Sequence, residues 1–223
     1  MDENIYIVIP AKDEGTRVGR VIQKTQHAGF HNIIIVNDGS TDNTAAIAEE
    51  FGVTVVSHPV NLGPGAATQT GIEYALRSGA DIIVTLDADE QHSPNDIQQL
   101  VHTMQTQKVD IVIGSRFLNK ENSIPTTRIF YNKIANVITY ILTGINVTDS
   151  QSGMKAMSRR FAHKSKLYFN GFEFCVEIIR NIRLHNATYT EVPIQVMYSE
   201  ETLSKGQSFF SGVRMLGKLF KIF

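Results

Sequence analysis

The chain has 223 residues, of which 42% are hydrophobic and 19% charged, and its formal net charge is −1 at pH 7. This composition is typical of a globular protein that buries its own core, and the near-zero charge argues against a nucleic acid as partner. The only cysteine, Cys175, excludes an internal disulfide bond. We therefore expect a reducing compartment, and a small buried side chain rather than a nucleophile.

Two kinds of membrane or export signal are missing from the sequence. No segment has 18 or more consecutive apolar residues, so we expect no membrane-spanning helix. The first residues lack the basic start and long apolar stretch of a secretory signal. We expect a cytoplasmic protein, and contact with a membrane surface stays open.

The first half of the chain alternates strand and helix patterns. Short runs rich in Ile and Val predict buried strands at residues 5–9, 33–36, 53–56, 82–86 and 110–113. Amphipathic stretches between them predict helices around residues 18–22, 45–51, 71–76 and 97–104. The alternation predicts an α/β fold, with a mostly parallel sheet and helices on both faces. Right-handed crossovers would place all strand ends at one edge, where such sheets bind ligands.

The second half is less regular. Its patterns predict helices at residues 125–143 and 171–184 and a strand at residues 188–194. No linker or repeat interrupts the chain, so residues 1–198 are predicted to form a single domain. Residues 199–223 are predicted to form a C-terminal loop and a basic amphipathic helix.

An acidic motif, Asp87-Ala88-Asp89-Glu90-Gln91-His92, directly follows the predicted strand at residues 82–86. Mg²⁺ or Mn²⁺ prefers oxygen ligands, often carboxylates completed by substrate phosphates. We predict that Asp87, Asp89 and Gln91 hold such an ion, with Asp89 the catalytic ligand, because a departing diphosphate must have its charge neutralised.

The alternative is a turn that caps a helix beginning at Pro94, for which Ser93 is a suitable N-cap. That interpretation does not explain two acids after a buried strand, so we favour the metal site. For His92, a packed or solvated side chain is at least as well supported as a ligand.

Two further loops are predicted to share this edge. Asp38 follows the strand at residues 33–36, and its carboxylate is expected to accept a hydrogen bond from a nucleobase N–H. Capping and turn formation explain the neighbouring Gly39 and Ser40 and are compatible with this role. Residues 10–14 close the first strand and would line the same edge.

The glycine-rich run Gly63-Pro64-Gly65 opens a predicted helix but fails as a dinucleotide-binding fingerprint, since Thr68 stands at the third glycine position. A helix N-terminus close to a phosphate stays open.

Taken in order, these segments resemble glycosyltransferase family 2, whose members have the GT-A fold, over residues 5–194. The most similar branch is that of the dolichyl-phosphate mannosyltransferase-like polyprenyl-phosphate glycosyltransferases. The resemblance rests on the acidic motif with Pro94, on Gly114-Ser115-Arg116-Phe117, on Asp149-Ser150-Gln151-Ser152-Gly153 and on Glu191-Val192-Pro193-Ile194.

The resemblance implies an inverting transfer of a sugar from a UDP- or GDP-sugar to a polyprenyl phosphate. The donor-binding residues it implies are Pro10, Ala11, Asp13, Glu14, Asp38 and Asp87, and the acceptor-phosphate residues are Arg116 and Arg128. The alternative for either arginine is a surface ion pair.

The sequence departs from the branch pattern in three places. Lys12-Asp13 replaces the more common Tyr-Asn, Pro64 replaces a lysine, and the usual arginine near a Gly-x-Ser-Lys pattern is missing. We expect Lys205 to contact the acceptor phosphate in its place.

The acceptor decides whether a base is required. A lipid phosphate is already ionised, whereas a saccharide hydroxyl, as in polysaccharide synthesis, needs a carboxylate to take its proton. Asp149 is the catalytic candidate and Glu177 the second choice. The alternative makes Asp149 an organiser of residues 149–153.

Two other classes are less well supported. A nucleotidyltransferase would need a glycine-rich loop after the first strand, and a non-catalytic nucleotide-sugar binding protein would not need the acidic motif.

Residues 209–223 combine apolar positions at helical spacing with Arg214, Lys218 and Lys221. Two alternatives stay open. An in-plane membrane helix would place the protein at the inner face of the plasma membrane, and otherwise the helix docks on the domain.

Overall fold

The computed structural model describes residues 3–197. The predictions for residues 199–223, including Lys205, lie outside the described residues. In chain order the elements are β1 (Ile5–Ala11), α1 (Val18–His27), β2 (Ile33–Asp38), α2 (Thr44–Glu50), β3 (Thr54–His58), α3 (Pro64–Arg77), β4 (Ile82–Thr85), α4 (Asp96–Gln107), β5 (Ile111–Ser115), α5 (Thr126–Thr143), β6 (Lys155–Ser158), α6 (Arg159–Lys164), α7 (Phe174–Leu184) and β7 (Tyr189–Pro193).

The strands form a seven-stranded sheet in the order β3-β2-β1-β4-β6-β5-β7. Strand β6 runs antiparallel to both of its neighbours, and the other pairings are parallel. The predicted α/β class and the mostly parallel sheet are therefore confirmed. The expectation that all strand ends meet at one edge is wrong for β6, whose amino end lies where the carboxyl ends of its neighbours lie.

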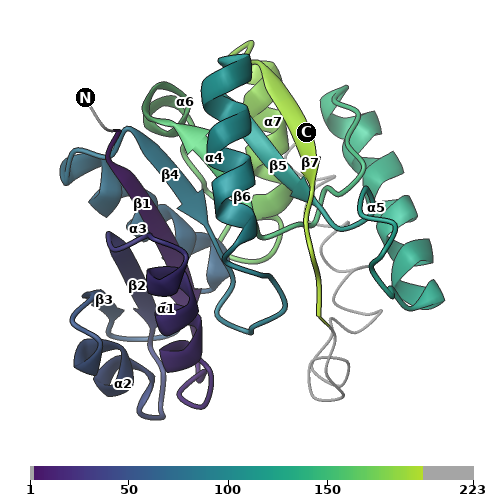
Figure 1. Ribbon diagram of the computed structural model, residues 1–223. Helices are drawn as coiled ribbons and strands as arrows, with labels where there is room; N and C mark the ends of the chain where they lie inside the picture. Colours follow the sequence, from purple (N-terminus) through teal and green to yellow (C-terminus); the bar gives the residue numbers. More distant parts are fainter. Residues whose placement is uncertain (1–2, 198–223) are drawn as a thin grey trace.

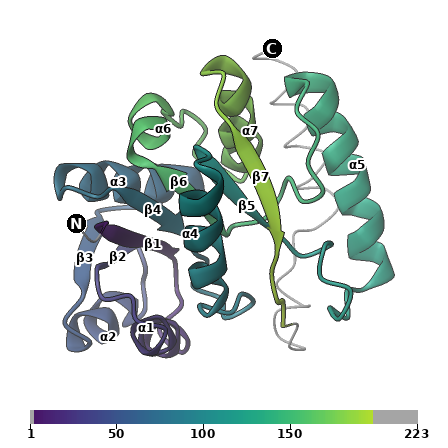
Figure 2. The same ribbon diagram turned by 45° about the horizontal axis from the view of Figure 1, so that its top comes forward.

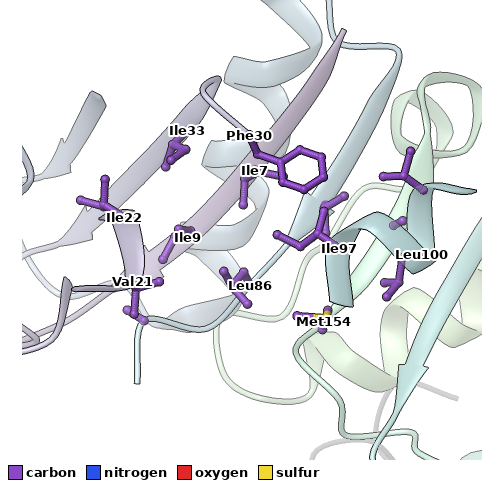
Figure 3. Close-up of a cluster of buried hydrophobic side chains, with 14 of the residues drawn as sticks. Ile7, Ile9, Val21, Ile22, Phe30, Ile33, Leu86, Ile97, Leu100 and Met154 are labelled. Carbon is purple, nitrogen blue, oxygen red and sulfur yellow. The ribbon is translucent and has the colours of Figure 1, made fainter. Parts of the chain in front are cut away.

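Helices cover both faces of the sheet, as predicted (Figure 2). Helices α1, α2 and α4 contribute buried side chains to the core on one face, and α3, α6 and α7 to the core on the other. Figure 3 shows the first core, in which Ile7 and Ile9 of β1 pack with Ile22 of α1 and Ile97 of α4. Val8, between those two isoleucines, belongs to the opposite core. This explains why the strand reads as a continuous apolar run.

The sequence patterns missed β6 and α6. The strand has only four residues, and it begins with a lysine, Lys155, so it carried no apolar run. Ser158 ends β6 and caps α6, where its Oγ accepts a hydrogen bond from the backbone N–H of Phe161 at 3.2 Å.

Helix α5 packs against α7 at the end of the sheet that carries β7 (Figure 1). Its bounds agree with the predicted helix at residues 125–143. Within residues 3–197, no helix, α5 included, is both long and apolar enough to cross a bilayer.

Candidate active site

The candidate site lies at the carboxyl ends of β1, β2 and β4. Because β1 pairs in parallel with both β2 and β4, the loops after these three strands are neighbours. With adjacent strands about 4.8 Å apart, the ends of β2 and β4 are roughly 10 Å from each other. The predicted donor residues Pro10 and Ala11 are the last two residues of β1 and pair with Val36 and Asn37 of β2. Three of the predicted loops thus meet at one edge.

Asp87 is the second residue after β4, and its carboxylate lies against Gly153 of the loop before β6. A Cβ atom on Gly153 would come within 2.0 Å of Asp87 Oδ2, so only glycine leaves room for this carboxylate. His92 Nε2 lies 3.6 Å from the same oxygen. Burial opposes ionisation of Asp87, but His92, Lys155 and Arg116 outweigh it, so the pKa of Asp87 lies below its usual value.

Asp89 is held by the third predicted ligand. Gln91 donates from its backbone N–H to Asp89 Oδ1 at 3.0 Å and from its side-chain Nε2 to Oδ2 at 2.6 Å. Burial raises the pKa of Asp89, and the negative charge of Asp87 adds to this effect. A carboxylate whose ionisation is hindered by a second carboxylate is suited to sharing a divalent cation with it.

The donor set fits a hard cation. Within residues 3–197 there is no group of three or more His, Cys, Asp or Glu side chains arranged to hold a metal ion. Two carboxylates and the Gln91 amide oxygen are the kind of oxygen ligands that Mg²⁺ would take here, together with water and substrate phosphates. The metal site stays a prediction that these residues fit.

Gln91 also contacts one of the predicted acceptor-phosphate residues. Its Oε1 accepts a hydrogen bond from Arg128 Nη1, at the start of α5, at 3.5 Å. One side chain therefore links the predicted metal ligand Asp89 to a predicted acceptor-phosphate arginine.

Arg116, at the end of β5, binds the carboxylate of Asp149. Its Nε and Nη2 donate to the two carboxylate oxygens at 2.7 and 2.8 Å, and its backbone N–H donates to Oδ2 at 3.0 Å. Asp149 is fully buried. Glu191 accepts hydrogen bonds from the backbone of Thr148 and Asp149 and so fixes the same loop. These contacts favour the alternative in which Asp149 organises residues 149–153, and its role as a base stays untested.

These contacts describe an acidic pair that is predicted to bind a cation, a buried arginine–carboxylate pair and a second arginine, all around one sheet edge. The sequence profile of glycosyl transferase family 2 matches residues 6–165. The chain belongs to glycosyl transferase family 2.

Relatives and solved structures agree with this assignment. The chain is 33% identical over 242 residues to the UDP-N-acetylglucosamine–dolichyl-phosphate N-acetylglucosaminyltransferase of Methanococcus voltae, covering 99% of this chain and 96% of the relative. It is 28% identical over 230 residues to the polyprenol monophosphomannose synthase of Mycolicibacterium smegmatis, covering 99% and 86%.

Among solved structures, the glucosyl-3-phosphoglycerate synthase of Mycobacterium tuberculosis is similar, in a complex with Mn²⁺, UDP and glucosyl-3-phosphoglycerate. The TM-score is 0.76 at 19% identity, over 98% of this chain and 77% of that one, so the two share the fold. The predicted family, its polyprenyl-phosphate branch and the GT-A fold are confirmed.

In this glycosyltransferase, Asp38 is 3% exposed and organises the segment that follows β3. Its Oδ1 contacts His58 Nδ1 at 2.8 Å, and its two oxygens accept hydrogen bonds from the backbone N–H groups of Leu62 and Gly63 at 2.8 and 2.7 Å. The predicted contact with a nucleobase is untested.

The glycines of the 63–65 run allow a close backbone approach. A Cβ on Gly65 would lie 1.9 Å from the carbonyl oxygen of Phe169, and one on Gly63 would lie 2.3 Å from that of Asn170. The N–H of Gly65 donates to Asn170 O at 2.8 Å and is not available to a phosphate. The glycines here serve packing, and a phosphate near this helix end stays untested.

The first loop is fixed to the loop after β2. Asp13 accepts a hydrogen bond from Thr41 N at 2.7 Å and pairs with Lys12, whose hydrogen bond is the main cause that lowers the pKa of Asp13 to about 2. Glu14 pairs with Arg17 at 2.6 Å. The two acids lie at the predicted edge, and their contact with the donor is untested.

Glu177, the second candidate base, accepts hydrogen bonds from the backbone N–H groups of Tyr168 and Phe169. Burial raises its pKa. Its carboxylate thus orders the segment that packs on the glycine-rich run.

Sequence reasoning missed Lys155, which is fully buried beneath the site and donates from Nζ to the carbonyl oxygen of Ser152. The sequence does contain a signal for this residue, namely a lysine within the otherwise apolar run Met154-Lys155-Ala156-Met157. A charged side chain in an apolar strand needs a partner.

Proposed function

We propose that this glycosyltransferase moves a sugar, with inversion at the anomeric carbon, from a UDP- or GDP-sugar to a polyprenyl phosphate. The names of the M. voltae and M. smegmatis relatives, which describe transfer to dolichyl phosphate and a polyprenol monophosphate product, support this acceptor.

The observation that carries the proposal is the position of Gln91 between Asp89 and Arg128. A residue of the predicted diphosphate site and a guanidinium suited to phosphate oxygens lie within reach of one side chain. A donor and an acceptor phosphate bound at these two places would be neighbours, as a direct displacement requires.

In this proposal each group of residues has a separate role in the transfer reaction. A divalent cation held by Asp87, Asp89 and Gln91 would neutralise the leaving diphosphate. The metal complexes of the M. tuberculosis structure support such an ion. Arg128 binds the acceptor phosphate, and Asp149 orients Arg116 toward the same acceptor through their paired hydrogen bonds.

The condition of the two candidate bases favours a phosphate acceptor over a saccharide hydroxyl. Asp149 is buried and engaged by Arg116, and Glu177 is engaged by backbone N–H groups. A phosphate oxygen that is already ionised needs neither of them.

A lipid acceptor also requires access to a membrane, and α5 offers a suitable face. Within Thr126–Thr143 there is no acidic residue, and Arg128 and Lys133 supply positive charge. Large apolar side chains on this helix are 40–68% exposed, namely Phe130, Tyr131, Ile134, Val137, Tyr140 and Ile141. An apolar face with basic residues suits the interface of an anionic bilayer. We propose that the protein binds the membrane peripherally through α5.

The function is tested with labelled UDP-N-acetylglucosamine, UDP-glucose and GDP-mannose, each offered to a short polyprenyl phosphate and, separately, to saccharides, with Mg²⁺ or with EDTA. We expect a glycosylated polyprenyl phosphate from one donor, and only with the metal. Transfer to a saccharide alone would contradict the lipid acceptor. Donor binding in a thermal-shift assay without transfer or hydrolysis would indicate a non-catalytic binding protein.

Membrane binding is tested by co-sedimentation with vesicles that contain anionic lipid. The double variant Val137→Asp, Ile141→Asp should lose most of the binding. The matched control is Leu184→Asp on α7, where the side chain is 56% exposed. Equal recovery of the wild type, the double variant and Leu184→Asp with the vesicles would contradict the proposed face. If only a protein that lacks residues 209–223 loses vesicle binding, that segment is the one that binds.

A further inference from the structure

Glu90 lies between two predicted metal ligands, Asp89 and Gln91, but its own side chain leads away from them to α1. Arg20 Nε lies 3.1 and 3.0 Å from its two carboxylate oxygens, and Arg20 Nη2 lies 2.5 Å from Oε2. Lys24, one turn further along α1, contributes a contact of 2.9 Å. The hydrogen bond from Arg20 is the largest of the causes that lower the pKa of Glu90 to about 2.

The backbone at Glu90 is independently unusual. Its φ angle is +63°, in the left-handed region that side chains other than glycine rarely adopt. Such a conformation persists only where the surroundings hold it. The positive φ turns the chain sharply between Asp89 and Gln91, so that the backbone N–H of Gln91 reaches Asp89 Oδ1.

The loop of residues 87–92 is therefore held at two places. On one side, Glu90 is bound to α1, whose Val18 and Ile22 are fully buried in the core, so this helix is a firm support. On the other side, the carbonyl oxygen of Gln91 accepts a hydrogen bond from the N–H of Met197 at 2.9 Å. Asp89 and Gln91 lie on either side of the Glu90 attachment.

We propose that Glu90 is a positioning residue, whose ion pairs with Arg20 and Lys24 hold the loop in the turn that brings Asp89 and Gln91 together as ligands of the donor metal. The proposal rests on the metal site of the proposed function. Like charges on Asp87 and Asp89 repel each other before a cation binds. An external attachment at residue 90 resists the opening that this repulsion favours.

The proposal predicts that loss of the ion pairs lowers the affinity for the metal ion but hardly changes the stability of the fold. Exposed ion pairs add little to folding, so breaking them should change the melting temperature only slightly. Loss of a residue that orients a metal ligand commonly weakens metal affinity by roughly 10- to 100-fold. Metal affinity should therefore fall in variants that remain folded.

The test measures Mn²⁺ binding in the presence of UDP or GDP by electron paramagnetic resonance, with melting temperatures in parallel. Glu90→Gln should raise the Mn²⁺ dissociation constant by roughly 10-fold or more. Arg20→Gln should do the same to a smaller extent, because Lys24 remains. The double variant should lose little beyond Glu90→Gln, since the two side chains act as one unit.

Glu90→Gly separates the ion pairs from the backbone conformation, because glycine adopts a positive φ without strain. We expect weak Mn²⁺ binding at an unchanged or raised melting temperature. Glu73→Gln is the matched control, since Glu73 forms a 3.6 Å pair with Arg77 on α3 and should leave Mn²⁺ binding unchanged.

Mn²⁺ affinity equal to that of the wild type in Glu90→Gln and Glu90→Gly, with metal-dependent transfer intact, would overturn the positioning role alone. Wild-type Mn²⁺ affinity in Glu90→Gly, together with weak Mn²⁺ affinity in Glu90→Gln, would also overturn the positioning role. The backbone strain at residue 90, and not the ion pairs with Arg20 and Lys24, would then decide the metal affinity. A wild type that transfers sugar without binding Mn²⁺ or Mg²⁺ would overturn the metal assignment, and the positioning role with it.

Discussion

Gly153→Ala tests the site at its most crowded point. The added methyl group would lie 2.0 Å from Asp87 Oδ2 and 2.5 Å from the other two carboxylate atoms. Ordinary van der Waals contact begins at 3.4 Å, so the carboxylate must retreat by about 1.4 Å. The φ angle of Gly153 lies outside the positive region, so alanine causes no backbone strain at this position.

The size of the effect follows from this displacement. The Asp87 side chain is 41% exposed and has room to rotate, so the fold should survive with a stability loss of about 1 kcal/mol. A misplacement of roughly 1 Å in a catalytic group costs about 10²-fold in rate. We therefore expect kcat/KM to fall about 10²-fold, together with a weaker apparent affinity for Mg²⁺.

The assay is transfer from the labelled donor to a detergent-soluble polyprenyl phosphate, measured over a range of Mg²⁺ concentrations. The control is Gly79→Ala, which has a positive φ of 87° and no atom within 4 Å of the added Cβ. It should lose about 1 kcal/mol of stability through backbone strain and keep its activity. Wild-type activity and Mg²⁺ dependence in folded Gly153→Ala would refute the placement of Asp87 in the metal site.

Three further outcomes are expected. Asp89→Ala should abolish turnover with any acceptor, and retained product formation in the labelled assay would contradict its role as a metal ligand. Asp149→Asn should reduce transfer to a phosphate acceptor mainly by raising the acceptor KM, because Arg116 loses a charged partner. If Asp149 is instead the base, the substitution should lower kcat severely with a hydroxyl acceptor. The pKa of Glu90 falls from 4.5 to about 2 on folding, so its stabilising effect is complete above pH 4.5 and is lost as the pH falls toward 2. The small difference in melting temperature between the wild type and Glu90→Gln should therefore shrink as the pH falls from 4.5 toward 2, and a difference that stays constant over this range would contradict the ion pairs.

The sequence by itself determined the architecture and one side of the site. Buried parallel strands leave continuous apolar runs, and the carboxyl ends of parallel strands meet at one edge. Local patterns therefore placed Asp38 and Asp87 at strand ends on the same edge of the sheet, and in the structure these two strands, β2 and β4, flank β1. Helix ends were less well defined: the amphipathic pattern of α3 began only at residue 71, and the glycine-rich run at residues 63–65 was the signal for its true start at Pro64.

The tertiary structure alone decided which distant side chains complete the site. The short antiparallel strand β6 enters between β4 and β5, and with the loop before it places Gly153 against Asp87 and buried Lys155 near the same carboxylate. Arg116 meets Asp149 across 33 residues of sequence, and Arg128 meets Gln91 across 37. Strand order and helix docking produce these encounters, and both depend on packing of the whole chain rather than on the periodicity of any one segment.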